Sequence, residues 1–392
     1  MKRSLLFTFS LLTLSACAST STPHAQSPQQ ATVSTPQALS EPYSPPTSSF
    51  QPNVAERPIK GGDSVSGRST FHLTDGRLAP WLDSWAQEVS ITKELPLEFV
   101  QQHLQAAQYN ASAARLMAPS KGRVKRSWIT YRERFVDPIR INAGVKFWQQ
   151  NQGILNEVEQ TYGVPASIIV AIIGVETIYG RYTGDFKVLD ALATLGFSYP
   201  DDSRPERGAL FRDQLADLLV LDYQGKIKIS EAYGSYAGAM GLPQFMPGSI
   251  KRFAVDYTQK GYVDLYRSIP DITASVANFL RVHGWQPGLP SFVKASLPKD
   301  PASLVTGGLQ PTLSWQQLSQ AGAHSTVEPL PTWLRTTKLG VINLVDEPSQ
   351  NVQYRIATPN FYALTHYNRS YFYATSVVDL AAELERNVKA AH

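Results

Sequence analysis

The stretch that decides the fold is residues 163–181, GVPASIIVAIIGVETIYGR. Gly163 and Pro165 interrupt the chain, and Pro165 is well placed as the first residue of a helix. The helix that follows is apolar on almost every side, which predicts that it is buried in the core. Gly180 is a natural end for it. The run is too short for a membrane span and carries a glutamate, so we interpret it as a core helix.

Glu176 is the one charged residue in that apolar run. Burial disfavours a carboxylate, and so does the carbonyl end of a helix, so both effects are expected to raise the pKa of Glu176. A glutamic acid that stays protonated near neutral pH can donate a proton to a glycosidic oxygen. A charged residue in such a helix can equally be half of a buried ion pair, and these residues alone leave both interpretations open.

Two further segments carry groups that suit the binding of sugars. Residues 234–248, GSYAGAMGLPQFMPG, let a ligand approach the backbone closely, and Ser235 and Gln244 offer hydroxyl and amide groups there. Residues 365–373, THYNRSYFY, hold side chains that can form a stacking and hydrogen-bonding wall. Taken separately, a tightly packed loop and aromatic core packing are competing interpretations of these two segments.

Together, and in this order, the three segments resemble the membrane-bound lytic transglycosylase B family of peptidoglycan lyases, from about residue 75 to the C-terminus. The resemblance implies an α+β, mainly α fold. A goose-lysozyme-like catalytic core, about residues 142–286, would carry additional helical and small β subdomains within residues 71–392. It also implies cleavage of the β-1,4 bond between N-acetylmuramic acid and N-acetylglucosamine, with 1,6-anhydromuramic acid ends as the product.

The resemblance further implies which residues act, with Glu176 as the catalyst. Two positions depart from the family pattern, because Leu210 stands where the family has a tyrosine and Phe279 replaces another. A family pair of arginines is replaced by residues 201–204, DDSR, with Arg207 as a remnant, so contacts to the peptide stems are expected to differ. The expected substrate-binding residues are Tyr131, Arg207, Ser235, Gln244, Phe279, Tyr367, Asn368 and Tyr373.

The reaction that the resemblance implies needs one acid–base group. Ordinary glycosidases use two carboxylates, and the candidates for a partner of Glu176 are Asp185, Asp190 and Glu231, none of them in an apolar or glycine-rich context. In the family's reaction, Glu176 would protonate the glycosidic oxygen. As an anion it would then take the proton from the 6-hydroxyl of the muramic acid, which closes on C1. We expect no cofactor.

Residues 256–267, DYTQKGYVDLYR, correspond to a calcium loop of EF-hand type that some family members carry. Gly261 keeps the turn position. Lys260 and Arg267, however, occupy the fifth and twelfth positions, where oxygen ligands are needed. The sequence therefore predicts no bound metal, with the two cations in place of the ion's charge.

Residues 1–16 are typical of a lipoprotein signal peptide. They contain Lys2 and Arg3, an apolar run and then small residues before Cys17, the only cysteine. Acylation of Cys17 would give stable membrane anchoring, and the residue that follows favours the periplasmic face of the outer membrane. A plain secretory signal is the alternative. Residues 17–70, rich in Ser, Thr, Pro and Gln, are predicted to form a disordered tether.

Hydrophobic spacing over the rest of the chain predicts helices and, late in the chain, two short strands. The predicted helical ranges are 79–117 (two or three helices), 142–162, 189–194, 207–221, 270–283 and 373–388, and the predicted strands are 339–345 and 354–356.

The composition argues against several other classes of protein. A net charge of +4, part of it from the signal peptide, and the lack of a dense basic run argue against nucleic acid. A single cysteine excludes an internal disulfide, and scattered histidines argue against a zinc amidase. The spacing around Ser235 is not that of a G-x-S-x-G hydrolase. A non-catalytic wall-binding lipoprotein is the remaining alternative, although it would not need Glu176. We expect a monomer that acts on glycan strands.

Overall fold

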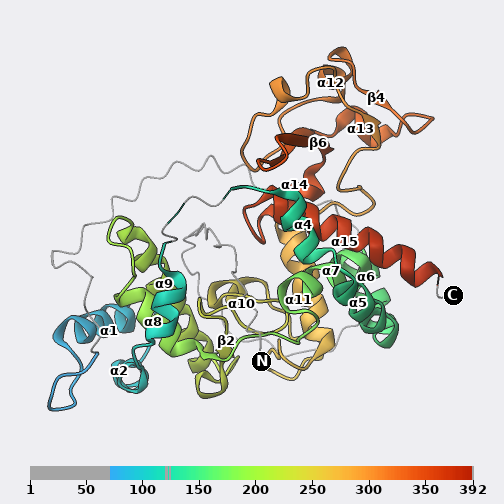
Figure 1. Ribbon diagram of the computed structural model, residues 1–392. Coiled ribbons are helices and arrows are strands. Elements are labelled where there is room, and N and C mark those ends of the chain that lie inside the picture. Colours follow the sequence, from blue (N-terminus) through green and yellow to red (C-terminus); the bar gives the residue numbers. More distant parts are fainter. Residues whose placement is uncertain (1–70, 120–121, 123–124, 391–392) are drawn as a thin grey trace, which may run out of the picture. The chain divides into compact units, whose positions relative to one another are not determined.

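The computed structural model describes residues 71–119, 122 and 125–390 (Figure 1). The signal peptide, Cys17 and the tether, predicted for residues 1–70, lie outside these described residues. Within them helices dominate, and the strands form three two-stranded antiparallel sheets. The mainly α prediction is therefore confirmed.

Three helices occupy the range 79–117, at the upper end of the predicted number. The loop between the second and the third is fixed to the next part of the core by two hydrogen bonds. The backbone N–H of Gln108 donates to Asp190 at 2.9 Å, and that of Asn110 donates to the hydroxyl of Thr194 at 2.8 Å. The elements are α1 (Pro80–Thr92), α2 (Leu97–Ala106), α3 (Ala111–Met117) and, carrying the two acceptors, α8 (Val188–Phe197).

The helical structure predicted for 142–162 is confirmed, and it is divided between two helices. The break falls at Asn151, whose side-chain amide donates to the carbonyl of Phe147 at 2.7 Å. Such a bond offers the backbone an alternative to the helical ladder. The helices in this region are α4 (Trp128–Phe135), α5 (Pro138–Gln150) and α6 (Gln152–Tyr162).

The apolar run forms α7 (Ala166–Thr177), in which every residue except Glu176 is buried. Pro165 is its N-cap, one position before the expected place. Gly163 ends α6 with a left-handed φ of 64°, and a Cβ there would lie 2.5 Å from the ring of Pro287. Helices α5, α6, α11 (Ile269–Val282) and α15 (Tyr371–Ala390) pack against α7, which explains why its sequence is apolar on every side.

Among the described residues, no single helix has the length and apolar character to cross a membrane, and one bent pair, α6 with α7, meets that test by length and composition only.

The segment between α7 and α11 forms the second side of the site. Strand β1 pairs with β2, with Phe186 opposite Gly234, and this pairing ties the start of the glycine-rich loop to the residues that follow α7. The helices predicted for 189–194 and 207–221 are confirmed, and both are longer than predicted. The elements are β1 (Phe186–Lys187), α8, α9 (Pro205–Tyr223), η1 (Ile229–Glu231), β2 (Tyr233–Gly234) and α10 (Pro247–Phe253).

Residues 290–358, which we call the β lobe, have a small hydrophobic core of their own. Its largest sheet runs antiparallel from Gly340 opposite Ala357 to Asp346 opposite Asn351, and it confirms both predicted strands. The elements are β3 (Ala295–Ser296), η2 (Ala302–Leu304), α12 (Trp315–Gln320), β4 (His324–Ser325), α13 (Thr332–Thr336), β5 (Gly340–Asp346) and β6 (Asn351–Ala357). The buried residues of its core are Leu318, Ala323, Leu334, Leu339, Val341 and Ile356.

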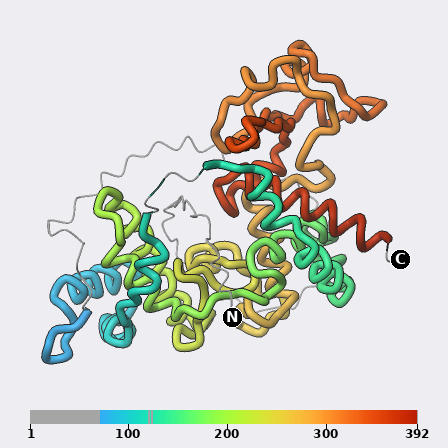
Figure 2. Tube along the Cα trace, viewed as in Figure 1, coloured from blue at the N-terminus to red at the C-terminus, as the bar shows by residue number. Residues whose placement is uncertain are grey.

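After the β lobe, α14 (Pro359–Thr365) and α15 return the chain to the main core. Helix α15 packs against α4, α5 and α7, and Figure 2 shows it in red beside the green helices. The last helix of the chain therefore lies against the helix that carries Glu176. One continuous hydrophobic core runs from the first described residues to α15, so the narrower boundary at 142–286 stays a prediction.

Candidate active site

Eleven of the twelve residues of α7 are buried, and the remaining one, Glu176, is partly exposed. Its Oε1 accepts a hydrogen bond of 2.6 Å from the hydroxyl of Tyr373 on α15. Burial of most of the side chain raises the pKa of Glu176 to about 7, against a smaller lowering by the Tyr373 hydroxyl. The raised pKa expected from the sequence is confirmed, and the carboxyl is poised between acid and base at neutral pH.

The competing interpretation of Glu176, half of a buried ion pair, has no support in this geometry. Within the described ranges, no lysine, arginine or histidine is among the causes that shift the pKa of Glu176. The buried cation Arg140 contacts α7 elsewhere: its Nε donates to the carbonyl of Gly174 at 3.1 Å, and its Nη1 pairs with Asp137 at 2.6 Å. Arg140 therefore caps the carbonyl end of the helix and is neutralised by Asp137.

Tyr367 and Tyr373 form a buried pair beside the carboxyl group. Their rings are nearly parallel, 14° apart in plane and 6.3 Å apart at the centroids. The hydroxyl of Tyr367 donates to the carbonyl of Pro243 at 2.7 Å, and burial holds the pKa of both tyrosines well above the usual value. With 7% and 3% of their surface exposed, the two rings offer little area for a sugar to stack on. The contacts of the two hydroxyl groups indicate instead that Tyr373 holds Glu176 and that Tyr367 holds the glycine-rich loop.

Ser235 and Gln244 use most of their hydrogen-bonding capacity to hold the glycine-rich loop. The hydroxyl oxygen of Ser235 accepts from the backbone N–H groups of Ala237 and Ala239. The side-chain amide of Gln244 donates to the carbonyl groups of Thr183 and Gly241, at 3.0 and 2.9 Å. Gln244 also has a left-handed φ of 51°. Its side-chain carbonyl oxygen has no hydrogen bond within the described ranges and is available to accept one from a ligand.

Thr177 joins α7 to that loop, a role that the sequence did not indicate. Its buried hydroxyl donates to the carbonyl of Leu242 at 3.0 Å and accepts from the N–H of Gly180 at 3.0 Å. The residue next to Glu176 therefore sets the position of the loop relative to the carboxyl. The hydroxyl also lies 3.3 Å from the carbonyl of Ile173 in its own helix. Because that bond is the usual one for a threonine in a helix, Thr177 gives only a weak signal in the sequence.

The remaining predicted substrate contacts fall in different places. Tyr131 on α4 is half-buried, with its ring 5.5 Å from that of Phe372, and it is among the groups that act on Tyr373. Asn368, in the turn before α15, is half-buried. Arg207 on α9 donates to the hydroxyl of Tyr199 at 3.4 Å, and no described contact joins it to Glu176.

Phe279 belongs to the core. It is 5% exposed, and its ring lies 4.8 Å from Tyr367 and 5.6 Å from Phe245. This burial gives a direct contact with substrate no support, and the substrate-binding role of Phe279 stays a prediction. The phenylalanine packs against Tyr367, because α11 presents it to the interior.

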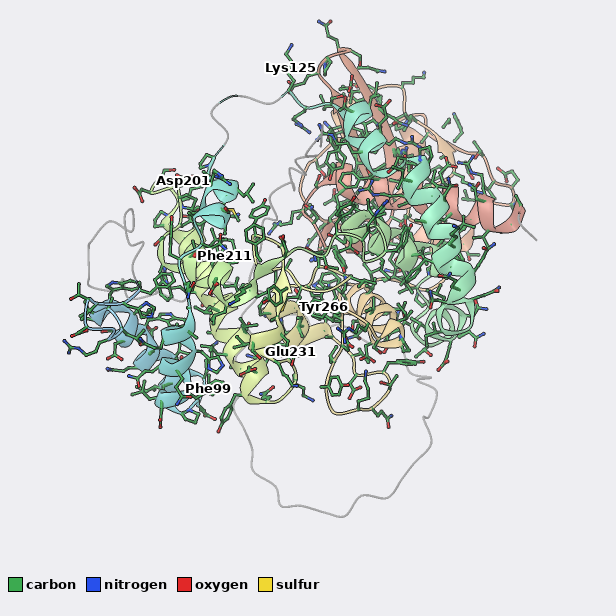
Figure 3. The ribbon with its side chains drawn as sticks, turned by 60° about the horizontal axis from the view of Figure 1, so that its bottom comes forward. Phe99, Lys125, Asp201, Phe211, Glu231 and Tyr266 are labelled. Carbon is green, nitrogen blue, oxygen red and sulfur yellow. The ribbon has the colours of Figure 1, made fainter. Side chains whose placement is uncertain are left out.

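No hydrogen bond or pKa effect within the described ranges joins Glu176 to the candidates for a second carboxylate. Asp185 and Glu231 are exposed, and Glu231 (Figure 3) pairs with Lys228 at 3.3 Å. Asp190 is buried, which raises its pKa, and it accepts from the Gln108 backbone. In the described part of the chain, no carboxylate contributes to the pKa shift of Glu176.

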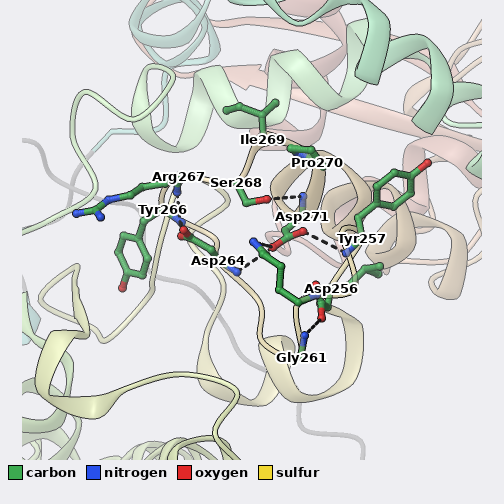
Figure 4. A network of polar contacts seen from close by, with 12 residues as sticks. Asp256, Tyr257, Gly261, Asp264, Tyr266, Arg267, Ser268, Ile269, Pro270 and Asp271 are labelled. Atoms are coloured by element: carbon green, nitrogen blue, oxygen red, sulfur yellow. Dashed lines mark hydrogen bonds and ion pairs between the residues drawn. The ribbon is translucent and has the colours of Figure 1, made fainter.

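The loop 256–267 closes on a buried carboxylate (Figure 4). Asp271, fully buried at the start of α11, accepts hydrogen bonds from the backbone N–H groups of Tyr257 and Asp264, and its Oδ2 pairs with the Nζ of Lys260 at 3.1 Å. The side chain of Arg267 is exposed and points away from this network. Lys260 alone therefore stands in for a cation, which corrects the expectation that both basic residues do so.

No group of three or more His, Cys, Asp or Glu residues that could hold a metal ion occurs in the described ranges. In loop 256–267 the carboxylate of Asp256 accepts from the backbone N–H groups of Lys260 and Gly261, so its oxygens face the chain's own donors. The absence of a bound metal stays a prediction, which these contacts support.

A largely buried carboxyl with a raised pKa, beside a tyrosine pair and joined through Thr177 to a glycine-rich loop, is the arrangement of a glycan-cleaving enzyme of lysozyme-like fold. A family model described as "Transglycosylase SLT domain" matches residues 77–382. The chain belongs to this family of transglycosylases.

The chain is similar to lytic murein transglycosylases of the B type. It is 38% identical over 254 residues to the membrane-bound lytic murein transglycosylase B of Escherichia coli K12, an alignment that covers 65% of this chain and 66% of that protein, just under two thirds. The crystal structure of the soluble lytic transglycosylase SltB1 of Pseudomonas aeruginosa matches with a TM-score of 0.70 and 36% identity, over 79% of this chain and 99% of that one.

A third relative was solved with a ligand. SltB3 of Pseudomonas aeruginosa, in complex with NAG-NAM-pentapeptide, matches with a TM-score of 0.67 and 28% identity, over 78% of this chain and 79% of that one. The lysozyme-like fold expected from the resemblance is confirmed by these matches.

Proposed function

We propose that this chain is a lytic transglycosylase that cleaves the β-1,4 bond between N-acetylmuramic acid and N-acetylglucosamine in peptidoglycan, with Glu176 as its single acid–base catalyst. The observation that carries the proposal is the state of Glu176. It is the one incompletely buried residue of a buried helix, its pKa is about 7, and no described carboxylate acts on it. Its membership of the transglycosylase family supports the same reaction.

The proposed reaction uses the carboxyl twice. Protonated Glu176 gives its proton to the glycosidic oxygen, and the bond between that oxygen and C1 of the muramic acid breaks. The sugar's N-acetyl group stabilises the positive charge on C1. The carboxylate, held by the hydrogen bond from Tyr373, then takes the proton of the 6-hydroxyl, and that oxygen bonds to C1. The proton count balances without water, and the product is a 1,6-anhydro sugar.

Other residues would bind and orient the glycan. The carbonyl oxygen of Gln244, the hydroxyl of Ser235, Asn368 and Tyr131 are the proposed substrate contacts, and Arg207 would meet a peptide stem. Tyr367 and Tyr373 would not contact the glycan but would support the glycine-rich loop and Glu176, because their hydroxyl groups already bind Pro243 and Glu176.

We also propose that the protein works at the periplasmic face of the outer membrane, held there by acyl chains on Cys17. The support is the sequence pattern around the only cysteine and the membrane-bound name of the Escherichia coli relative. A Cys17→Ser variant should lose radiolabelled palmitate and leave the membrane fraction while purified enzyme keeps its activity. Retention of the label would show that Cys17 is not the acylated residue.

The chemistry is tested by digesting purified peptidoglycan and weighing the products by mass spectrometry. The expected muropeptides are lighter by one water than the products of hydrolysis. Glu176→Gln should abolish release while leaving the melting curve cooperative, and Glu231→Gln, the matched change at an exposed glutamate, should keep full activity. Hydrated reducing ends would identify a hydrolase. Binding of glycan without any release would identify a non-catalytic wall-binding protein.

A further inference from the structure

Helix α7 ends at Thr177, one residue after Glu176, and the turn that follows has an uncommon backbone conformation. Ile178, Tyr179 and Gly180 follow one another with left-handed φ angles of 50°, 58° and 88°. Glycine adopts this region freely, but for a β-branched or bulky residue it is strained by about 1–3 kcal/mol. Two such residues in succession require that the surrounding structure holds them in place.

The ring of Tyr179 is the feature that holds this turn. It lies between α5 and α7, at a position where each helix has an interior glycine. A Cβ built on Gly144 would lie 2.8 Å from the Cζ of Tyr179, and one on Gly174 would lie 2.7 Å from it, with the hydroxyl closer still in both cases. Glycine inside a helix is about 1 kcal/mol less favourable than alanine. The two glycines therefore make their helices slightly less stable but leave room for the ring of Tyr179. This ring also stacks on that of Phe147, with the two centroids 5.3 Å apart.

The hydroxyl of Tyr179 does not explain the arrangement. It is buried, and in the described ranges it has no hydrogen-bond partner. The donors of the neighbouring Arg140 bind the carbonyl groups of Gly174 and Arg134 and the carboxylate of Asp137. A buried hydroxyl without a partner costs stability. The ring, as a wedge, is therefore what fixes the turn.

The wedge acts on the same turn of helix that carries Glu176. The N–H of Ile178 donates to the carbonyl of Gly174 at 3.1 Å, and the N–H of Tyr179 donates to that of Ile173 at 3.4 Å, so the hydrogen bonds that close the helix enclose Glu176. If the ring left its slot, these bonds and the direction of the Glu176 side chain would change together.

We propose that Tyr179 is a positioning residue for the reaction: its ring, wedged between Gly144 and Gly174, fixes the left-handed turn that ends α7 and so holds the carboxyl of Glu176 against Tyr373. The proposal rests on the assignment of Glu176 as the acid–base catalyst. Tyr179 itself touches neither substrate nor the reacting atoms.

The first test compares two replacements of the wedge in the purified protein. Tyr179→Phe keeps the ring and should leave kcat, KM and the pH profile within about twofold of the parent. Tyr179→Leu removes the ring, and kcat should fall by about tenfold to a hundredfold with KM within threefold, because misplacement by about 1 Å costs that much. Its alkaline decline in activity should also begin at lower pH, since a loosened helix end lets water reach Glu176.

Phe197→Leu is the matched control for lost packing. Phe197 is a buried aromatic residue at the end of α8, packed against Trp85 and away from α7. The Phe197→Leu variant should lower the melting temperature as Tyr179→Leu does, without shifting the pH profile of activity. If Tyr179→Leu loses only what Phe197→Leu loses, or if its profile is unchanged, the proposal is overturned.

The second test displaces the ring of Tyr179 by a substitution on a helix that does not carry Glu176. Gly144→Ala on α5 places a methyl group against the Tyr179 ring and against the flexible end of Leu384, 2.5 Å away. It should shift the pH profile in the same direction. Gly144→Ala combined with Tyr179→Phe removes the nearest clash and should restore part of kcat. If neither the shift nor the rescue is observed, the proposed role of the Tyr179 ring is overturned, even if Tyr179→Leu fails to fold.

Glu176→Gln is assayed beside these variants. If it keeps activity, the assignment of the catalyst fails, and the proposal fails with it. If it is inactive while Tyr179→Leu and Gly144→Ala behave like the parent, the catalyst stands and only the role of Tyr179 is rejected.

Discussion

The hydroxyl of Tyr373 donates a 2.6 Å hydrogen bond to Oε1 of Glu176 across 197 positions of the sequence. This bond lowers the pKa of a carboxyl that burial raises, and the balance leaves it at about 7. A group with that pKa is both protonated and ionised near neutral pH. Both forms are required when one residue serves first as acid and then as base.

Removal of that hydroxyl should shift the reactivity of Glu176 in a defined direction. In Tyr373→Phe the carboxylate loses a donor worth about 1.5 kcal/mol, so the pKa of Glu176 rises by about one unit and the alkaline decline in activity moves to higher pH. The carboxylate is also less well held in the second step, and kcat should fall by about tenfold. Tyr371→Phe, in the same helix but bonded to Gly308, is the control and should leave the profile unchanged. A shift to lower pH would contradict the assigned hydrogen bond.

The raised pKa of Glu176 should make the fold less stable as the pH rises. Between the ordinary value of 4.5 and about 7, the folded state holds a proton that the unfolded chain has lost. The contribution is full below pH 4.5 and is lost as the pH passes 7, with a limit of about 3 kcal/mol. Glu176→Gln should therefore unfold at higher denaturant concentration than the parent at pH 8, and show a smaller difference at pH 5. An equal difference at both pH values would rule out a raised pKa.

Loop 256–267 should be stable without calcium because Lys260 already neutralises Asp271. Added calcium or a chelator should leave the melting temperature of the protein unchanged. Lys260→Met, which leaves a fully buried carboxylate without its cation, should lower the melting temperature markedly. The control is Lys228→Met, whose lysine forms an exposed pair with Glu231, and its effect should be small. A rise in melting temperature on adding calcium to the parent would show that the loop binds the ion.

Thr177 should couple the catalytic helix to the glycine-rich loop. Thr177→Val keeps the shape of the side chain but leaves the carbonyl of Leu242 without its donor in a buried place, which costs about 1–3 kcal/mol of unfolding free energy. The loop should also shift relative to Glu176, so kcat/KM should fall by more than the loss of folded protein explains. Thr177→Ser keeps the hydroxyl and should restore most of both quantities. Equal activity of the valine and serine variants would show that Thr177 does not couple the helix to the loop.

Part of the site was predictable because it depends on local properties of the chain. An apolar run of twelve residues with one glutamate predicts a buried helix and a raised pKa whatever packs around it. The glycine-rich segment likewise predicts a close-packed loop. What the loop's polar side chains do was not predictable in this way. The donors of Gln244 face the carbonyl groups of Thr183 and Gly241, and Phe279 faces the interior.

The sequence by itself determined the buried helix, the lone carboxyl within it, the two strands of the β lobe and, by resemblance, the family, because each depends on composition, spacing or ordered motifs. Only the tertiary structure decided that Tyr373 holds Glu176, that Tyr179 is wedged between two helices, and that Lys260 rather than Arg267 meets Asp271. A hydrogen bond or a close contact requires approach to within about 3 Å. Residues far apart in sequence reach such distances only when the packing of the whole chain brings them there.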